Sequence, residues 1–227
     1  PFQVTMLRYW AFAAFALFLA SRQAPLRQAL RSRAPGLQVL RGTLLMVNIW
    51  LCTFAFRTVP LAEFQAIIML APLLVTLFAI PILGERVGVF RLTAVGVGFL
   101  GALIILRPGG LPRDMGALFA LIGSTLYALY LTFTRKVAAY DSPITSIVYV
   151  AVTGAVLGTG VGLFFLQPMD MIGIALLLVV MTTTCVGHSL MTVALSLAPA
   201  STLQPFNYLS LPWGITLGFL VFGHMID

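Results

Sequence analysis

The segment from residue 172 to residue 196 reads IGIALLLVVMTTTCVGHSLMTVALS and contains no Asp, Glu, Lys or Arg. A helix needs roughly 20 such residues to cross about 30 Å of hydrocarbon, so this segment is long enough to span a bilayer. Its apolar residues run continuously instead of alternating, which favours a helix over a barrel strand. We therefore expect an all-α membrane protein.

The composition of the chain supports the same fold class. Of 227 residues, 60% are hydrophobic and 8% are charged, against about 25% charged in ordinary soluble domains. The two cysteines lie inside apolar runs without metal-ligand spacing, so no metal site is expected. Apolar runs bounded by charge, Gly or Pro predict eight spans, at residues 2–20, 42–56, 61–83, 91–106, 116–134, 143–166, 171–196 and 200–222.

The cations indicate how these spans are oriented. Lys and Arg number 13 against 6 acids, and they lie in short loops between apolar runs, which argues against nucleic-acid binding. Nine of them fall on one side of the alternating spans, in the 22–41, 84–91 and 135–136 segments, and three fall on the other. The positive-inside rule places the nine-cation side in the cytoplasm.

An internal repeat links residues 55–84 with residues 194–223. At a constant offset of 139 (194 minus 55), four identities recur, Ala55 with Ala194, Pro60 with Pro199, Gln65 with Gln204 and Gly84 with Gly223. The third and eighth spans that carry the copies are separated by four helices, so the copies cross the bilayer in opposite directions. Inverted repeats are typical of secondary transporters. We expect a ten-helix parent in which residues 1–110 form the first five-helix repeat without its first helix, and residues 111–227 form the second without its last.

Motifs within the first copy resemble those of the drug/metabolite transporter superfamily, in particular its EamA-like branch. They are Leu61-Ala62-Glu63, Ala71-Pro72-Leu73, Leu83-Gly84-Glu85-Arg86 and, further on, Arg107-Pro108-Gly109. The resemblance implies a multi-pass transporter of the bacterial inner membrane that moves a small organic metabolite, with a homodimer as a compatible assembly. It also implies a central cavity lined by the second, third, fifth, seventh and eighth spans.

Polar residues on those five spans are the candidate contacts for a substrate, because polar groups facing lipid are costly. Thr184, His188 and Thr192 recur every four residues, with Ser196 next, and form one stripe. The unperturbed pKa of a histidine side chain, near 6.5, would suit proton coupling at His188. Interhelical hydrogen bonding, worth about 0.6 kcal/mol on average, is the structural alternative. For Glu63 the alternative is stabilisation by the helix dipole in a first turn. The full set is Asn48, Trp50, Glu63, Tyr127, Tyr130, His188, Gln204, Asn207 and Tyr208.

Small residues and prolines suggest packing features. Gly154, Gly158 and Gly162 form a ridge on the sixth span, and Ala94, Gly98 and Ala102 form one on the fourth, which would allow close helix approach. Pro72 and Pro81 remove backbone donors and should kink the third span.

Other functional classes lack their motifs. There is no Gly-x-x-x-x-Gly-Lys loop for ATP, no His-Glu-x-x-His metal helix and no pair of intramembrane aspartates. We therefore predict a secondary transporter without a cofactor, and not an enzyme. A channel or a structural membrane subunit is the alternative, and the inverted repeat favours a transporter over both.

Overall fold

The computed structural model describes residues 1–23, 27, 30–59, 61–90, 93, 96–97, 100, 115–207 and 216; for residues 61–63, 66 and 205 only the backbone is described. Its helices are α1 (Phe2–Gln23), α3 (Pro35–Thr58), α4 (Leu61–Ile68), α5 (Ala71–Leu83), α7 (Met115–Val137), α8 (Pro143–Gly162), the 3₁₀ helix η2 (Leu163–Phe165), α9 (Met171–Leu197) and α10 (Ala200–Asn207).

Five of the described segments are long and apolar enough to cross a membrane: α1, α3, α7, α8 together with η2, and α9. The predicted bounds of the first, fifth, sixth and seventh spans agree with these helices to within three residues. Most of the fourth predicted span and most of the eighth, including the ridge of Ala94, Gly98 and Ala102, lie outside the described residues. The prediction of a helical, multi-pass membrane protein is confirmed.

The second span was predicted at residues 42–56, and this was wrong at its start. Helix α3 begins seven residues earlier, at Pro35, which occupies its first turn. The prediction had taken Arg41 as a boundary because charged groups are costly in hydrocarbon. Arg41 is instead fully buried inside the helix bundle, where neighbouring polar groups bind its guanidinium.

The third span is divided into two helices. Helix α4 ends at Ile68, Met69 and Leu70 form a turn, and α5 starts at Ala71 with Pro72 in its first turn. The expected interruption near Pro72 is therefore present, and Pro81 lies inside α5. A left-handed Gly84, with φ of 67°, ends α5, as is common where a residue without Cβ closes a helix.

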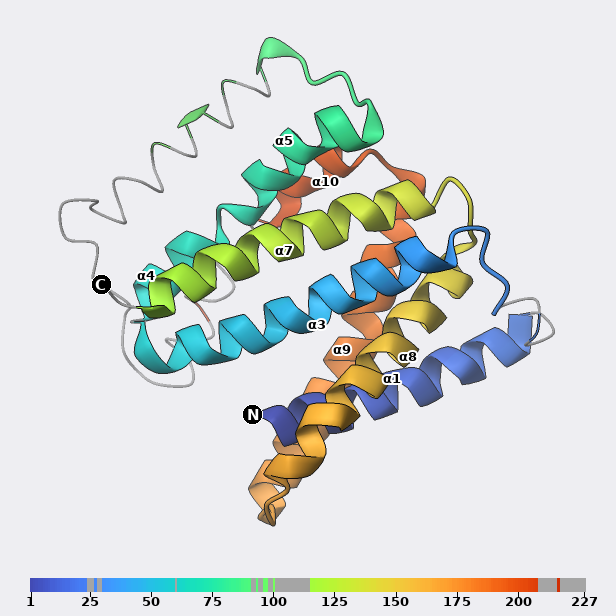
Figure 1. The fold of residues 1–227 in the computed structure, drawn as a ribbon, viewed down its shortest axis with the longest axis vertical. Coiled ribbons are helices and arrows are strands. Elements are labelled where there is room, and N and C mark those ends of the chain that lie inside the picture. Colours follow the sequence, from blue (N-terminus) through green and yellow to red (C-terminus); the bar gives the residue numbers. More distant parts are fainter. Residues whose placement is uncertain are drawn as a thin grey trace.

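The bundle has two neighbouring groups of helices (Figure 1). Helices α3 and α7 lie side by side, and α4, α5 and α10 pack near α7. Helix α1 packs against α8 and α9, while α8 also contacts α3 and so joins the two groups.

Helices α1 and α8 approach closely along the predicted glycine ridge. A Cβ added at Gly154 would lie 2.2 Å from Cδ1 of Tyr9, and one at Gly162 would lie 2.6 Å from Cβ of Met6. At Gly158 the nearest atom would be Cε of Met46, at 3.1 Å. The ridge is confirmed as a packing surface.

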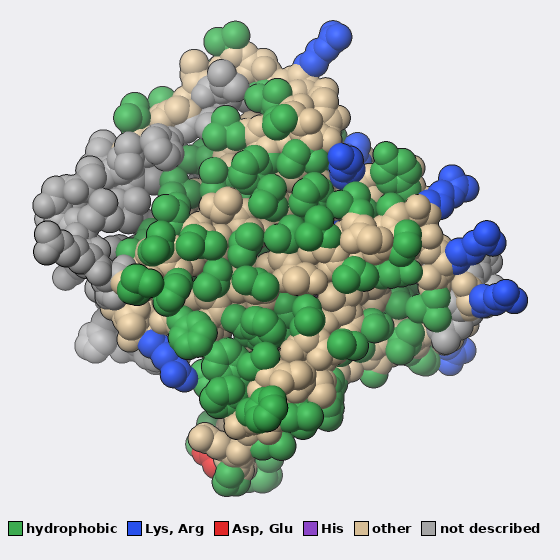
Figure 2. Space-filling model, in the orientation of Figure 1, with side chains coloured by type: hydrophobic (Ala, Val, Ile, Leu, Met, Phe, Trp, Pro, Cys, Tyr) green, Lys and Arg blue, Asp and Glu red, His purple; other side chains and the backbone are tan. Residues whose placement is uncertain are grey.

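The outer surface carries many large apolar side chains (Figure 2). Apolar residues cover the middle of the face shown, and most of its visible Lys and Arg side chains gather where α1 ends and α3 begins. Such extensive exposed apolar area is what a lipid-facing surface requires.

Candidate substrate-binding site

His188 on α9 lies among three aromatic rings from two other helices. Its ring centroid is 5.5 Å from that of Phe12 and 6.3 Å from that of Tyr9, both on α1. Tyr130 on α7 meets it edge-on, with centroids 6.5 Å apart. We call Tyr9, Phe12, Tyr130 and His188 the aromatic cluster.

Helical periodicity on α1 positions its part of the cluster. Tyr9, Phe12, Ala16 and Ala20 are completely buried and recur at spacings of three or four residues, which places them on one face of the helix. The small alanines let α1 approach its neighbours. Sequence analysis missed Tyr9 and Phe12, because helical spacing shows that they share a face but not whether this face meets protein or lipid.

Several polar atoms beside the cluster are buried without a hydrogen-bond partner among the described residues. They include the hydroxyl of Tyr9 and Nε of Arg8. The guanidinium of Arg8 also lies over the ring of Tyr9, with Cζ 5.4 Å from the centroid. Buried polar groups are nearly always satisfied in proteins. These groups therefore form a set that a polar ligand could bind.

Two hydroxyl groups of the predicted polar stripe on α9 are hydrogen bonded within that helix. The hydroxyl of Thr192 donates to the carbonyl oxygen of His188 at 2.8 Å, and that of Ser196 donates to Val193 at 2.6 Å. Both hydroxyls are thus satisfied by their own helix. His188 is the residue of the stripe that belongs to the aromatic cluster, and Thr192 lies within hydrogen-bonding reach of Tyr130.

Tyr127 on α7 and Asn48 on the neighbouring α3 extend the candidate site beyond the aromatic cluster. The rings of Tyr127 and Tyr130 stack with centroids 6.0 Å apart. Asn48 on α3 lies at the interface with α7, since its Oδ1 would be 3.2 Å from a Cβ added at Gly123. Gly123 is one turn from Tyr127 on the same face of α7. The structure therefore brings Asn48 and the two tyrosines to one helix interface.

The remaining predicted residues are not members of the aromatic cluster, or their side chains are not described. Trp50 is two positions from Asn48, about 200° around the helix, so the two do not share a face, but Trp50 packs against the buried core that contains Tyr9, Phe12 and Tyr130. Gln204 and Asn207 on α10 are hydrogen bonded to each other at 2.9 Å, and Nε2 of Gln204 also donates to Ala200 at 3.1 Å. The side chain of Glu63 and the whole of Tyr208 lie outside what the structure describes.

A buried polar network closes the bundle at its predicted cytoplasmic end. The guanidinium of Arg41 donates from Nε to Oε1 of Gln38 at 2.7 Å and from one terminal nitrogen to Thr134 at 3.0 Å. Its other terminal nitrogen donates to the backbone oxygen of Ser146. Arg41 thereby joins α3, α7 and α8, a role that sequence analysis missed.

Asp141, in the turn between α7 and α8, completes this network. Its carboxylate accepts hydrogen bonds from the hydroxyl of Ser32, from the backbone N–H of Arg33 at 2.8 Å and from Nε2 of Gln38 at 2.8 Å. Partial burial raises the pKa of Asp141, but these hydrogen bonds together with the charge of Arg41 outweigh it and hold the pKa below its ordinary value.

The lowered pKa of Asp141 predicts an acid-dependent loss of stability. A carboxyl group whose folded-state pKa is depressed stabilises the fold above its unfolded pKa of about 3.9, and this contribution is lost as pH falls through the lower folded value. Asp141→Asn should therefore melt below wild type at neutral pH, and the difference should narrow below about pH 4. Thermal unfolding of both purified proteins from pH 7 to pH 3 measures this difference in melting temperature. Tyr140→Phe, at the half-exposed neighbouring position, is the control with a wild-type profile. A difference that stays constant with pH contradicts the prediction.

Two further polar contacts join helix ends at this side. Arg135, at the end of α7, donates to the carbonyl oxygens of Leu195 and Ser196 at 2.9 and 3.0 Å, where a cation suits the C-terminal end of α9. Glu85 accepts from the backbone N–H of Ala200 at 3.0 Å and from the hydroxyl of Ser201 at 2.6 Å. It thus caps the N-terminus of α10 from the loop after α5.

Comparison with known proteins identifies the family. The sequence pattern of the EamA-like transporter family matches residues 1–107. A riboflavin transporter of Vibrio cholerae is 30% identical over 226 residues, which cover 98% of this chain and 76% of that protein. The chain belongs to the EamA-like transporter family.

Other similar proteins are named for riboflavin or for S-adenosylmethionine. A riboflavin transporter of Brucella anthropi is 29% identical, with 86% of this chain and 71% of that protein covered. An S-adenosylmethionine uptake transporter of Rickettsia prowazekii is 22% identical, with 88% and 68% covered. The predictions of a transporter of small metabolites, of a multi-pass membrane protein and of a chain that is not an enzyme are confirmed.

Proposed function

We propose that this EamA-like transporter is a secondary carrier that moves its substrate across the cytoplasmic membrane by alternating access. The two inverted repeats, residues 1–110 and 111–227, would move against each other around a site between them. The offset of 139 between the copies supports this arrangement, as does the presence of Arg86 in the loop after the first copy, whereas residues 223–227 contain neither Lys nor Arg. The two repeats should superpose after rotation about an axis in the membrane plane.

The substrate class that we propose is a planar aromatic heterocycle bearing hydroxyl groups, of which riboflavin is an example. The observation that carries this proposal is the aromatic cluster around His188, which includes the hydroxyl of Tyr9 that has no described partner. Aromatic side chains stack on flat rings with an offset or edge-on geometry. Hydroxyl groups beside them can donate to ring carbonyl groups or accept from substrate hydroxyls. The identities of 29 to 30% to riboflavin transporters support the same class.

The charge beside the cluster favours a neutral substrate over a cationic one. The guanidinium of Arg8 lies over the ring of Tyr9, so it is a fixed positive charge next to the proposed site. A sulfonium compound such as S-adenosylmethionine would bring a second positive charge to this region of low dielectric. Riboflavin is uncharged at neutral pH, and Arg8 can donate hydrogen bonds to its carbonyl oxygens.

Initial rates of radiolabelled riboflavin uptake into cells that lack their own uptake system test the proposal. We expect saturable uptake, competed by unlabelled riboflavin more strongly than by S-adenosylmethionine. His188→Ala should reduce the uptake rate at low substrate by about tenfold or more, the effect of losing at least about 1.4 kcal/mol of binding. Tyr9→Phe, Asn207→Ala and Glu63→Gln should each reduce the uptake rate as well.

One control variant completes the test, and three outcomes would contradict the proposal. Val186→Ala replaces a half-exposed residue of α9 and should transport like wild type at equal membrane abundance. Uptake that rises linearly without saturation would indicate a channel. Saturable uptake of S-adenosylmethionine alone would reject the substrate class. Wild-type rates in all four site variants would mean that the site lies elsewhere.

A further inference from the structure

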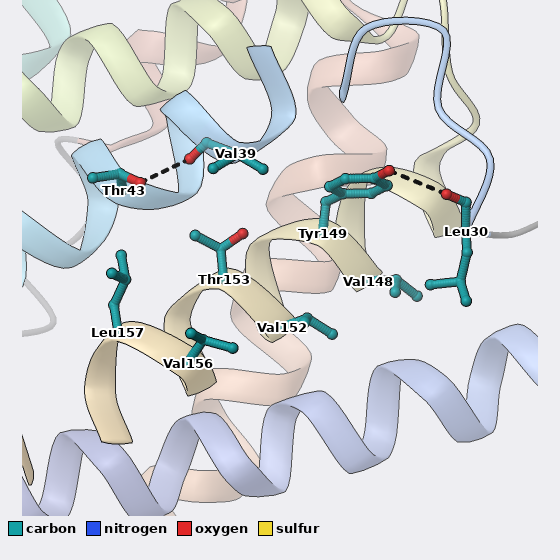
Figure 3. Close-up of a pocket in the computed structure, with 9 residues that line it drawn as sticks. All are labelled: Leu30, Val39, Thr43, Val148, Tyr149, Val152, Thr153, Val156 and Leu157. Atoms are coloured by element: carbon teal, nitrogen blue, oxygen red, sulfur yellow. Dashed lines mark hydrogen bonds between the residues drawn. The ribbon is translucent and has the colours of Figure 1, made fainter. Parts of the chain in front are cut away.

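A groove lies between α3 and α8, and it shares no lining residue with the aromatic cluster (Figure 3). It encloses about 450 Å³, and its lining side chains are Leu30, Val39, Thr43, Val148, Tyr149, Val152, Thr153, Val156 and Leu157. Cavities of this size are in the range of small-molecule sites. Most of the lining is apolar, so an apolar occupant fits it.

Two of the three polar side chains along the groove are hydrogen bonded to backbone carbonyl groups. The hydroxyl of Thr43 donates to the carbonyl oxygen of Val39 at 3.0 Å, and that of Tyr149 donates to Leu30 at 3.1 Å. The side chain of Thr153 packs directly against α3, since a Cβ added at Gly42 on α3 would lie 2.9 Å from Cβ of Thr153. The groove therefore offers its occupant an apolar surface along its length.

The length and openness of the groove match one leaflet of a bilayer. From Val148 to Leu157 there are nine helical rises of about 1.5 Å, or about 14 Å, which is close to half of the 30 Å hydrocarbon core. Val152 and Val156 are 37% and 65% exposed, so the groove opens toward the lipid. An acyl chain can enter it sideways from the bilayer.

Cations lie at the end of the groove that is expected to be cytoplasmic. Leu30 lines the groove, and the side chains of Arg31 and Arg33 that follow it are exposed. The nearby carboxylate of Asp141 already accepts from Ser32, Arg33 and Gln38. Exposed arginines at the cytoplasmic membrane surface attract anionic lipid headgroups.

We propose that this groove binds one anionic phospholipid, with an acyl chain between α3 and α8 and the headgroup against Arg31 and Arg33. The site is separate from the proposed substrate site, and it does not depend on which compound is transported. The lipid would fill the space beside the Gly42–Thr153 contact and so hold α3 and α8 together.

Native mass spectrometry of the purified full chain tests this site. Phosphatidylglycerol and phosphatidylcholine with identical acyl chains are added separately, and the fraction of protein that retains one lipid is measured. We expect retention of phosphatidylglycerol to exceed that of phosphatidylcholine by about tenfold. The Arg31→Gln, Arg33→Gln double variant should abolish this preference. Val152→Phe, which fills the groove from an exposed position, should reduce retention of both lipids.

Matched controls separate this site from general adherence of lipid. Arg57→Gln replaces an exposed arginine at the other end of α3, and Val179→Phe enlarges an exposed valine of α9; both should retain lipid like wild type. Equal retention of the two lipids by the wild type would overturn the proposal, as would wild-type retention by Val152→Phe. A lipid-free dimer that is lost in Val152→Phe would also overturn it, because a second copy of the chain would then fill the groove.

Discussion

Gly154→Ala should destabilise the protein and reduce transport, whereas Gly160→Ala on the same helix should not. The added Cβ at Gly154 would lie 2.2 and 2.3 Å from two ring carbons of Tyr9, which is completely buried and cannot move aside freely. At Gly160 no heavy atom lies within 4 Å of the added Cβ. Overpacking of this kind costs about 1–3 kcal/mol, or roughly 3–10 °C in melting temperature for a chain of this size.

The comparison between these two variants isolates the contact with Tyr9. Both gain the higher helix propensity of alanine over glycine, about 1 kcal/mol, so this gain cancels in their difference. Thermal unfolding of both purified variants, with uptake measured at equal membrane abundance, gives the two readouts. Tyr9 belongs to the aromatic cluster, so a shifted ring should also lower uptake. Equal melting temperatures for the two variants would mean that α1 and α8 separate without cost.

Arg41→Met should be the other strongly destabilising change. Methionine retains much of the length of the side chain, but it leaves Gln38, Thr134 and the backbone oxygen of Ser146 without their donor. Leaving buried acceptors unsatisfied costs about 1–3 kcal/mol each, so a total of roughly 2–4 kcal/mol, or about 5–15 °C in melting temperature, is expected after partial relaxation.

Two other substitutions show whether charge or geometry matters at Arg41. Arg57→Met, at an exposed position of the same helix, should melt close to wild type. Arg41→Lys keeps the charge but loses the planar set of donors that reaches three partners, so it should fall between wild type and Arg41→Met. A melting temperature of Arg41→Met equal to that of Arg57→Met would show that the network contributes nothing to stability.

The helices that the sequence predicted well are those whose ends are marked by local chemistry. Helix α9 was expected at residues 171–196 and is found at Met171–Leu197, because Asp170 caps its first turn by accepting from the backbone N–H of Gly173 at 2.9 Å. Helix α8 starts at the predicted Pro143 after its cap Ser142. Capping residues act on their own helix, so they can be identified without knowledge of the fold.

The start of α3 could not be predicted in this way, because its cause is tertiary. A charged residue normally ends an apolar span. At Arg41 the hydrogen-bond acceptors on α7 and α8 offset the free-energy cost of burying the charge. Those partners are about one hundred residues away in sequence. The spacing of Gln38 and Arg41, three residues apart on one helix face, is the local sign that the two side chains interact.

The candidate site was predicted in part. Tyr127, Tyr130 and His188 were expected from polar and aromatic stripes on α7 and α9, and the last two meet in the aromatic cluster. Tyr9 and Phe12 were missed because an aromatic residue in a transmembrane helix is equally consistent with contact with lipid. Their burial depends on how α1 lies against α8 and α9, which the sequence pattern of one helix does not determine.

The contact of Glu85 with α10 bears on how the two halves of the chain could separate. Glu85 follows α5 in the first half, and the N–H groups of Ala200 and Ser201 belong to the second. The contact lies at a helix terminus near the expected membrane surface, where water can hydrate both a carboxylate and free N–H groups. Parting the halves here would exchange three protein hydrogen bonds for hydration, and no ion would have to enter hydrocarbon. The contact between Glu85 and α10 can therefore break and re-form repeatedly at a small net cost in free energy.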